Sequence, residues 1–314
     1  MRLGNPGIDW YVLDKVLHAG LSGAKQIYGR DGAETMAISA ATDTKSLSES
    51  IWVERHEGKY IIPPSLMPAI REYIALFCDP DPNCHGFPPE YVTTTLQLDT
   101  VGMSLHHAKE NESVTRFKLR ARTYGTDGKS PVFMEIKRKI IGVVVKSRAR
   151  IPRDKWCSEL ILDPKRLLDV EFRSAKEEYA FLEFVRLTRE IGATPKVLVR
   201  YTRESYVSRV DDYARVTFDR NLLYQPTHSW DSWGDAGKWW PIDTPFTQDK
   251  GNRYSGVILE IKTMSNPPMW VVELIENFDL ARTGNCKYSS AVWTESLFGE
   301  TPAAAEYATA LFLP

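Results

Sequence analysis

The clearest alternation of apolar and polar positions runs from residue 116 to residue 125, in the sequence RFKLRARTYG. Side chains on a β-strand point to opposite faces in turn, so this stretch predicts a strand. One face would carry Phe117, Leu119 and Ala121 and would pack on a core. The other face would carry four cations, which are Arg116, Lys118, Arg120 and Arg122.

Further strands are predicted from the same alternation or from a high density of β-branched residues. They cover residues 51–62, 91–100, 132–140, 143–151, 196–207, 213–224 and 256–264. Asp127-Gly128 is a turn signal, so strands 116–125 and 132–140 should form a hairpin.

Helical spacing of apolar positions is found at residues 65–77, 174–192 and 267–278, and a further helix is predicted from about residue 286. The helix at 174–192 begins with a capping box, Ser174 to Glu177, and ends at Gly192. Strands and helices do not alternate regularly, which excludes a doubly wound fold. The predicted fold class is α+β, with mostly antiparallel strands and helices packed outside them.

Composition divides the chain into unequal parts. Residues 1–50 are predicted to be a peripheral extension, because residues 36–50 are small, polar and aperiodic. Residues 51–296 form the main domain, and residues 297–314 are predicted to be a C-terminal tail. Residues 226–255 are an insertion containing Trp230, Trp233, Trp239 and Trp240. Packing of these indoles on the protein's own surface is favoured over stacking on bases or sugars.

The overall composition argues against a transmembrane protein, a secreted protein and a cysteine- or histidine-based metal or redox site. The chain has 314 residues, 43% hydrophobic and 26% charged, which is typical of a globular protein. No run of about 18 apolar residues and no secretion signal is found, so a cytoplasmic location without a membrane segment is expected. The four cysteines lack a CxxC pair and the six histidines lack metal-ligand spacing. Reduced, mostly buried thiols are therefore predicted.

Positive charge is concentrated between residues 116 and 150, where eleven cations face only Asp127 and Glu135. Strand parity places Glu135, Lys137 and Lys139 on one face. On the following strand it aligns Lys146, Arg148 and Arg150 in the same way. Same-face residues of adjacent strands lie about 5 Å apart, so a continuous cationic surface is predicted. Such a surface destabilises the fold unless an anion lies within it.

Three explanations of this surface were compared. A solvated face would contain more carboxylates. A nucleic-acid site would need interleaved aromatic residues, and a net charge of −1 argues against a broadly basic surface. Polyanionic phosphate inside a closed or cupped sheet fits the pattern best.

Later strands add complementary groups. Tyr201, Arg203 and Ser205 share a face, as do Arg215, Thr217 and Asp219. Glu260 lies with Lys262, as a lone carboxylate among cations. It could ligate a divalent metal or act as a counter-ion, and the pattern does not choose between these roles.

The chain resembles a known family in an ordered series of motifs. These are ERHEGKYII, TTLQLDT, KLRARTYG, VFMEIKRK, VKSRARI, YTRES, VTFD, LEIK and CKYSS, within residues 51–296. In this order they resemble the VTC (vacuolar transporter chaperone) polyphosphate polymerase domain of the triphosphate tunnel metalloenzyme superfamily. The resemblance implies an antiparallel eight-stranded β-tunnel with a cationic interior. It also implies transfer of the ATP γ-phosphoryl group to a growing polyphosphate chain, with Mn²⁺ or Mg²⁺ as cofactor.

Site residues are implied by matching positions. The implied phosphate ligands are Arg55, Lys59, Arg120, Arg122, Lys137, Lys146, Tyr201, Arg203, Lys287 and Ser289. Those expected to be catalytic are Lys59, Arg120, Arg122, Lys137, Arg203 and Glu260, with Glu260 as the metal ligand. The implied partners are ATP and inorganic polyphosphate, without nucleic acid.

Two departures from the family pattern keep alternatives open. Ser290 stands where the polymerase motif has a second lysine, and Arg55 stands where the triphosphatase branch has the first glutamate of its ExExK signature. The second departure favours the polymerase branch. A metal-dependent triphosphatase and a non-catalytic polyanion-binding module remain as alternative functions.

Overall fold

The structure is a computed structural model that describes residues 55–141, 143–163, 170–211, 213–234, 238–242 and 256–312. The chain divides into two units, Met1–Trp52 and Val53–Pro314. The predicted peripheral segment 1–50 lies outside the described residues. Everything below concerns the second unit.

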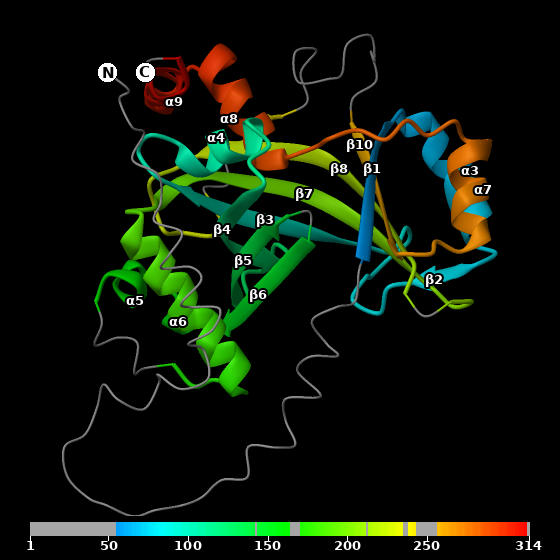
Figure 1. The fold of residues 1–314 in the computed structure, drawn as a ribbon, viewed down its shortest axis with the longest axis horizontal. Helices are drawn as coiled ribbons and strands as arrows, with labels where there is room; N and C mark the ends of the chain where they lie inside the picture. The colour runs from blue at the N-terminus through cyan, green and yellow to red at the C-terminus, as the bar shows by residue number, and fades with distance from the viewer. Residues whose placement is uncertain are drawn as a thin grey trace, which may run out of the picture. The chain divides into compact units, whose positions relative to one another are not determined.

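One antiparallel sheet forms the centre of this unit (Figure 1). Its eight main strands are β1 (Arg55–Ile62), β3 (Glu90–Asp99), β4 (Thr115–Tyr124), β5 (Val132–Ile140), β6 (Val143–Ile151), β7 (Thr194–Ser208), β8 (Arg215–Pro226) and β10 (Val257–Met264). They follow the order β1-β10-β8-β7-β3-β4-β5-β6. Two short strands, β2 (Cys78–Pro80) and β9 (Trp240–Pro241), pair with β7 and β8. The predicted α+β class and the eight strands are confirmed.

The sheet is curved but not closed by backbone hydrogen bonds. Strands β1 and β6 stand at the two ends of the order and are not paired with each other in the described part of the chain. Side chains of β1 and β5 nevertheless meet across the interior, where Glu57 lies 3.5 Å from Lys137. The expected tunnel is therefore an open, curved sheet whose inner side chains contact one another.

The outer face of β4, β5 and β6 packs on helix α6 (Ala175–Glu190). Leu119 and Ala121 are buried there with Phe181 and Phe184. The predicted cap is only half realised. The Ser174 hydroxyl accepts a hydrogen bond from the Glu177 backbone N–H, but the Glu177 carboxylate accepts from the backbone N–H groups of Arg150 and Arg173. This carboxylate thus ties the start of α6 to β6.

Other helices cover the two ends of the sheet (Figure 1). At one end, α3 (Met67–Ile74) and α7 (Met269–Asn277) share a buried apolar cluster with β1, β8 and β10. At the other end lie α4 (Ser104–Glu110), α8 (Lys287–Phe298) and α9 (Pro302–Phe312). A short helix, α5 (Ser158–Leu162), contacts α6. Neither α4 nor α9 was predicted.

The C-terminal segment is not a peripheral tail. The expected tail 297–314 contains α9, whose Tyr307 is fully buried and donates a hydrogen bond to the Lys196 carbonyl.

The four thiols are free, but only Cys78 is buried, so the prediction of mostly buried thiols was wrong. No helix among the described residues is long and apolar enough to span a membrane.

The tryptophans of the insertion pack on the protein itself. Trp230, Trp233 and Trp239 lie against the apolar cluster beneath α6. Together with Trp156 and Arg153, Trp230 and Trp233 line a cavity of about 540 Å³. Residues 235–237 and 243–255 of the insertion lie outside the described residues.

Candidate functional site: a cationic inner face

Register places the cations of β4, β5 and β6 in rows across the sheet. Lys118 is opposite Lys137, which is opposite Lys146. In the next row Glu135 lies between Arg120 and Arg148. The predicted parity of these strands is confirmed. The name inner face is used below for the inward side chains of β1, β4, β5, β6, β7, β8 and β10, together with those of Cys286, Lys287 and Ser289 at the start of α8.

Glu135 is the anion at the centre of these rows. Its side chain is fully buried, and Arg120 Nε lies 2.7 Å from Oε2. Lys146 Nζ lies 2.6 Å and Arg148 Nε 3.1 Å from Oε1, with Arg122 Nε 3.8 Å from Oε2. Burial raises the pKa of this carboxyl, but Arg120 and Arg122 hold it well below its usual range. One carboxylate therefore balances part of the charge of four cations.

Asp219 on β8 forms a second centre. Arg203 donates two hydrogen bonds to its carboxylate, at 2.6 and 2.7 Å, and Lys287 Nζ lies 2.7 Å from Oδ2. Burial raises the pKa of Asp219, but the attraction of Arg203 and Lys287 is larger and lowers it. Tyr201 lies beside both cations, with Lys287 Nζ 4.7 Å from its ring centre. These groups come from β7, β8 and the start of α8.

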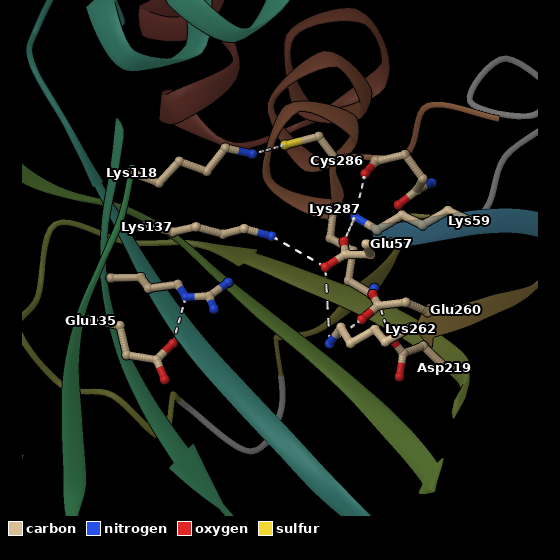
Figure 2. A network of polar contacts seen from close by, with 12 residues as sticks. Glu57, Lys59, Lys118, Glu135, Lys137, Asp219, Glu260, Lys262, Cys286 and Lys287 are labelled. Carbon is tan, nitrogen blue, oxygen red and sulfur yellow. Dashed lines mark hydrogen bonds and ion pairs between the residues drawn. The ribbon is translucent and has the colours of Figure 1, made fainter. Parts of the chain in front are cut away.

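A third group joins β1 to β10 (Figure 2). Glu57 lies 3.1 Å from Lys59 and 3.9 Å from Lys262, and Lys262 Nζ lies 2.5 Å from Glu260 Oε1. Lys59 also donates to the Asn285 carbonyl at 3.1 Å. Burial raises the pKa of Glu260, but Lys262 and other nearby cations hold it well below its usual range.

Two lysines on the inner face have pKa values below the ordinary value for lysine. The pKa of Lys137 and that of Lys146 are each lowered to about 8. Burial is the main cause in both, and Arg120 adds repulsion. The nearby carboxylates Glu57 and Glu135 offset only part of this cost. An additional anion beside these two side chains would therefore stabilise their charged forms.

The sequence was compared with known protein families and structures. A family model described as the VTC domain matches residues 54–294. The chain belongs to the VTC domain family. Comparison with curated proteins gave no match.

Among solved structures, the PH1819 protein from Pyrococcus horikoshii OT3 is similar at 12% identity and a TM-score of 0.38, covering 77% of this chain and 99% of that chain. A Hippeastrum protein, HpAC1, studied as an adenylyl cyclase and described as revealing a dominant triphosphatase activity, is similar at 17% identity and a TM-score of 0.40. That match covers 75% of this chain and 93% of that chain.

In this VTC domain most of the residues implied by the resemblance lie together on the inner face. Those joined through shared ion pairs or ring contacts are Lys59, Arg120, Arg122, Lys137, Lys146, Tyr201, Arg203, Glu260 and Lys287. Ser289 is buried in the first turn of α8. Arg55 lies in β1 opposite Met264, but its side chain is outside the described part.

The sequence predicted only one carboxylate of the site, Glu260, whereas Glu57, Glu135 and Asp219 also form its ion pairs. Glu260 is not a lone carboxylate, because Glu57 and Asp219 lie near enough that its negative charge acts to raise the pKa of both. Glu135 and Asp219 were visible on inward faces by parity. Their central positions depend on register and on contacts between distant strands, which alternation alone does not specify.

The VTC domain offers an incomplete site for a divalent metal. Among the described residues, no group of three or more Asp, Glu, His or Cys side chains is arranged to hold a metal ion. Mg²⁺ in phosphate-transfer sites needs only one or two protein carboxylates, because substrate oxygens and water complete its shell. Glu260 fits that role as a hard oxygen donor, provided that Lys262 releases it.

Proposed function

We propose that the inner face binds the phosphates of ATP and of a polyphosphate chain, and that the protein is an ATP-dependent polyphosphate polymerase. The observation that carries this proposal is the set of inward cations held by buried carboxylates of the protein. Arg120, Arg122, Lys146 and Arg148 around Glu135 are the fullest example.

The internal ion pairs indicate how a polyanion would bind. Folding has already removed much of the water around these cations. Binding of a phosphate chain therefore carries a smaller desolvation cost for them. Phosphate oxygens would replace or share the carboxylate partners, and the arginines can present two parallel N–H groups. The negative charge of the polyanion would raise the pKa of Lys137 and of Lys146 and so favour their charged forms.

Phosphoryl transfer requires positioning and charge neutralisation more than a protein nucleophile. In the proposed reaction, a terminal oxygen of the polyphosphate attacks the γ-phosphorus of ATP, and the bond to the β–γ bridging oxygen breaks to release ADP. Lys59, Arg120, Arg122, Lys137 and Arg203 would hold the phosphates in line. Glu260 would hold Mn²⁺ or Mg²⁺, which supplies further charge neutralisation when bound.

Two observations support alternative functions. Glu57 and Glu260 lie close together, which would also suit a metal-dependent triphosphatase. Ser290 in place of a lysine removes one cation from α8, which would suit a module that binds polyanions without turnover. Both alternatives use the same inner face.

The products of one incubation separate these functions. Purified full-length protein is incubated with ATP and Mn²⁺, and in parallel with Mg²⁺, and the products are resolved by chain length. A polymerase gives long phosphate chains with matching ADP, whereas hydrolysis of ATP gives free phosphate with matching ADP and no chains. Binding of triphosphate without ATP consumption would leave the binding module and would contradict the enzymatic proposal.

A further inference from the structure

One nucleophile on the inner face has no part in the proposed reaction. Lys118 Nζ lies 2.8 Å from Cys286 Sγ, which joins β4 to the residue that precedes α8 (Figure 2). Lys118 shares its face with Arg120 and Arg122. The thiol is therefore among the proposed phosphate ligands, and it is only partly buried.

The surroundings of Cys286 differ from those of the other thiols. Burial raises its pKa, but Lys118 and the hydroxyl and N–H of Ser289 lower it to about 6. Burial instead raises the pKa of Cys78 to about 12 and also raises that of Cys84. Ser289 is 3% exposed, and apart from this sulfur its hydroxyl has no hydrogen-bond partner among the described residues. Lysine, helix start and hydroxyl thus converge on one sulfur.

We propose that Cys286 is an oxidation site, at which a hydroperoxide converts the Lys118-paired thiol to a sulfenic acid and thereby weakens polyanion binding. The effect on binding rests on the proposed function. The oxidation itself rests on the pair of side chains and can be measured separately.

The reaction balances with the groups present and one named oxidant. The thiolate sulfur attacks one oxygen of hydrogen peroxide, the O–O bond breaks, and an S–O bond forms. Sulfur loses two electrons, and the leaving hydroxide takes a proton from the Lys118 ammonium to become water. The neutral amine is then reprotonated by solvent.

Oxidation and polyanion binding should oppose each other, because Lys118 pairs with the sulfur and also lies in the row of Lys137 and Lys146, within reach of a bound polyanion. A bound phosphate would draw the ammonium away from the sulfur, which removes the main stabilisation of the thiolate and slows its oxidation. After oxidation, the added oxygen occupies space on the inner face between Lys118 and the start of α8. A phosphate chain is excluded from that space, and its binding is weakened.

The test uses full-length protein, limiting hydrogen peroxide and dimedone, which traps sulfenic acids, with each cysteine peptide quantified by mass spectrometry. Cys157 is exposed and serves as the internal reference. We expect Cys286 to be trapped at least tenfold faster than Cys157, and Lys118→Gln to slow Cys286 trapping about tenfold. Inorganic triphosphate should protect Cys286 but not Cys157. Peroxide should weaken triphosphate binding several-fold in wild type, reversibly with dithiothreitol, but not in Cys286→Ser.

Trapping of Cys157 ahead of Cys286, or equal Cys286 trapping in Lys118→Gln, would overturn the proposed oxidation site. The ratio of Cys286 to Cys157 trapping and the protection by triphosphate are both measured in the wild type, so neither depends on whether Lys118→Gln folds well. Rapid, Lys118-dependent trapping without triphosphate protection would support the oxidation site and count against the proposed polyanion site. The two proposals can therefore fail separately.

Discussion

Arg120 and Arg122 both point inward from β4 and both lie near Glu135, so their substitution tests the inner face. In the proposed site, truncating either side chain would remove charge-assisted hydrogen bonds to phosphate. Arg120→Ala and Arg122→Ala should each weaken triphosphate binding by about 1.5–3 kcal/mol, measured by calorimetry.

A matched arginine lies on the outer side. Arg186 on α6 pairs with Glu183 and Glu190, so Arg186→Ala should leave triphosphate affinity unchanged. Leu119 directly precedes Arg120 on β4 but packs in the core, so Leu119→Ala should lower stability, by about 2–5 kcal/mol. Equal affinity in the inward arginine variants and in wild type would exclude these side chains as phosphate ligands.

The lowered lysine pKa values predict two opposite pH dependences. Lys137 and Lys146 titrate near 8 in the fold, against an ordinary value of 10.5. Between these values the unfolded chain binds more protons, so these lysines make the free energy of unfolding rise with pH. In the proposed site triphosphate is bound by the charged form of these lysines, so affinity should fall as pH rises through about 8.

Arginine keeps its charge across this range, which provides a control. Lys146→Arg should flatten the fall in triphosphate affinity between pH 7 and pH 9, measured by titration at constant ionic strength. A wild-type affinity that does not fall over this interval would contradict the assignment of Lys137 and Lys146 to the site.

At the scale of elements, strand alternation was the most informative part of the sequence. The inward row of β4 follows from period-two spacing, which is a local property of a strand. The pair formed by Lys118 and Cys286 joins residues far apart in the chain, so it depends on how the sheet and α8 pack together. Helix α4 was not predicted, because the residue directly before it supplies no side-chain cap. Asp99, at the end of β3, instead accepts hydrogen bonds from the backbone N–H groups of Leu105 and His106 in its first turn.

The same carboxylate connects α8 to the sheet. The Tyr288 hydroxyl donates to Asp99 Oδ2 at 2.7 Å, in the first turn of the helix that carries Lys287. Tyr288→Phe should lower the free energy of unfolding by about 1–3 kcal/mol, measured with urea, because a buried acceptor loses a donor. It should also weaken triphosphate binding, because the start of α8 is less firmly held.

Tyr179→Phe is the matched control, because Tyr179 is 49% exposed on α6. It should change neither stability nor affinity. An unchanged urea midpoint in Tyr288→Phe would show that the bond to Asp99 does not hold α8.

At the scale of the whole molecule, the inner face carries many cations against four nearby carboxylates, which are Glu57, Glu135, Asp219 and Glu260. A polyanion that binds the folded state should therefore raise the melting temperature. Triphosphate should raise it more than orthophosphate at equal concentration, because it spans more ligands. The absence of any shift with triphosphate at low salt would favour a solvated, non-binding face.

The central claim is that one inner face both holds phosphate and uses Glu260 to hold the metal for phosphoryl transfer. Glu260→Gln removes a negative charge beside Lys262 and also removes the proposed metal ligand. The decisive measurement compares this variant with wild type in two assays, metal-free triphosphate binding and ATP consumption with Mn²⁺. We predict binding equal to or tighter than wild type, together with a loss of turnover by orders of magnitude. Turnover at the wild-type rate in Glu260→Gln would contradict the claim.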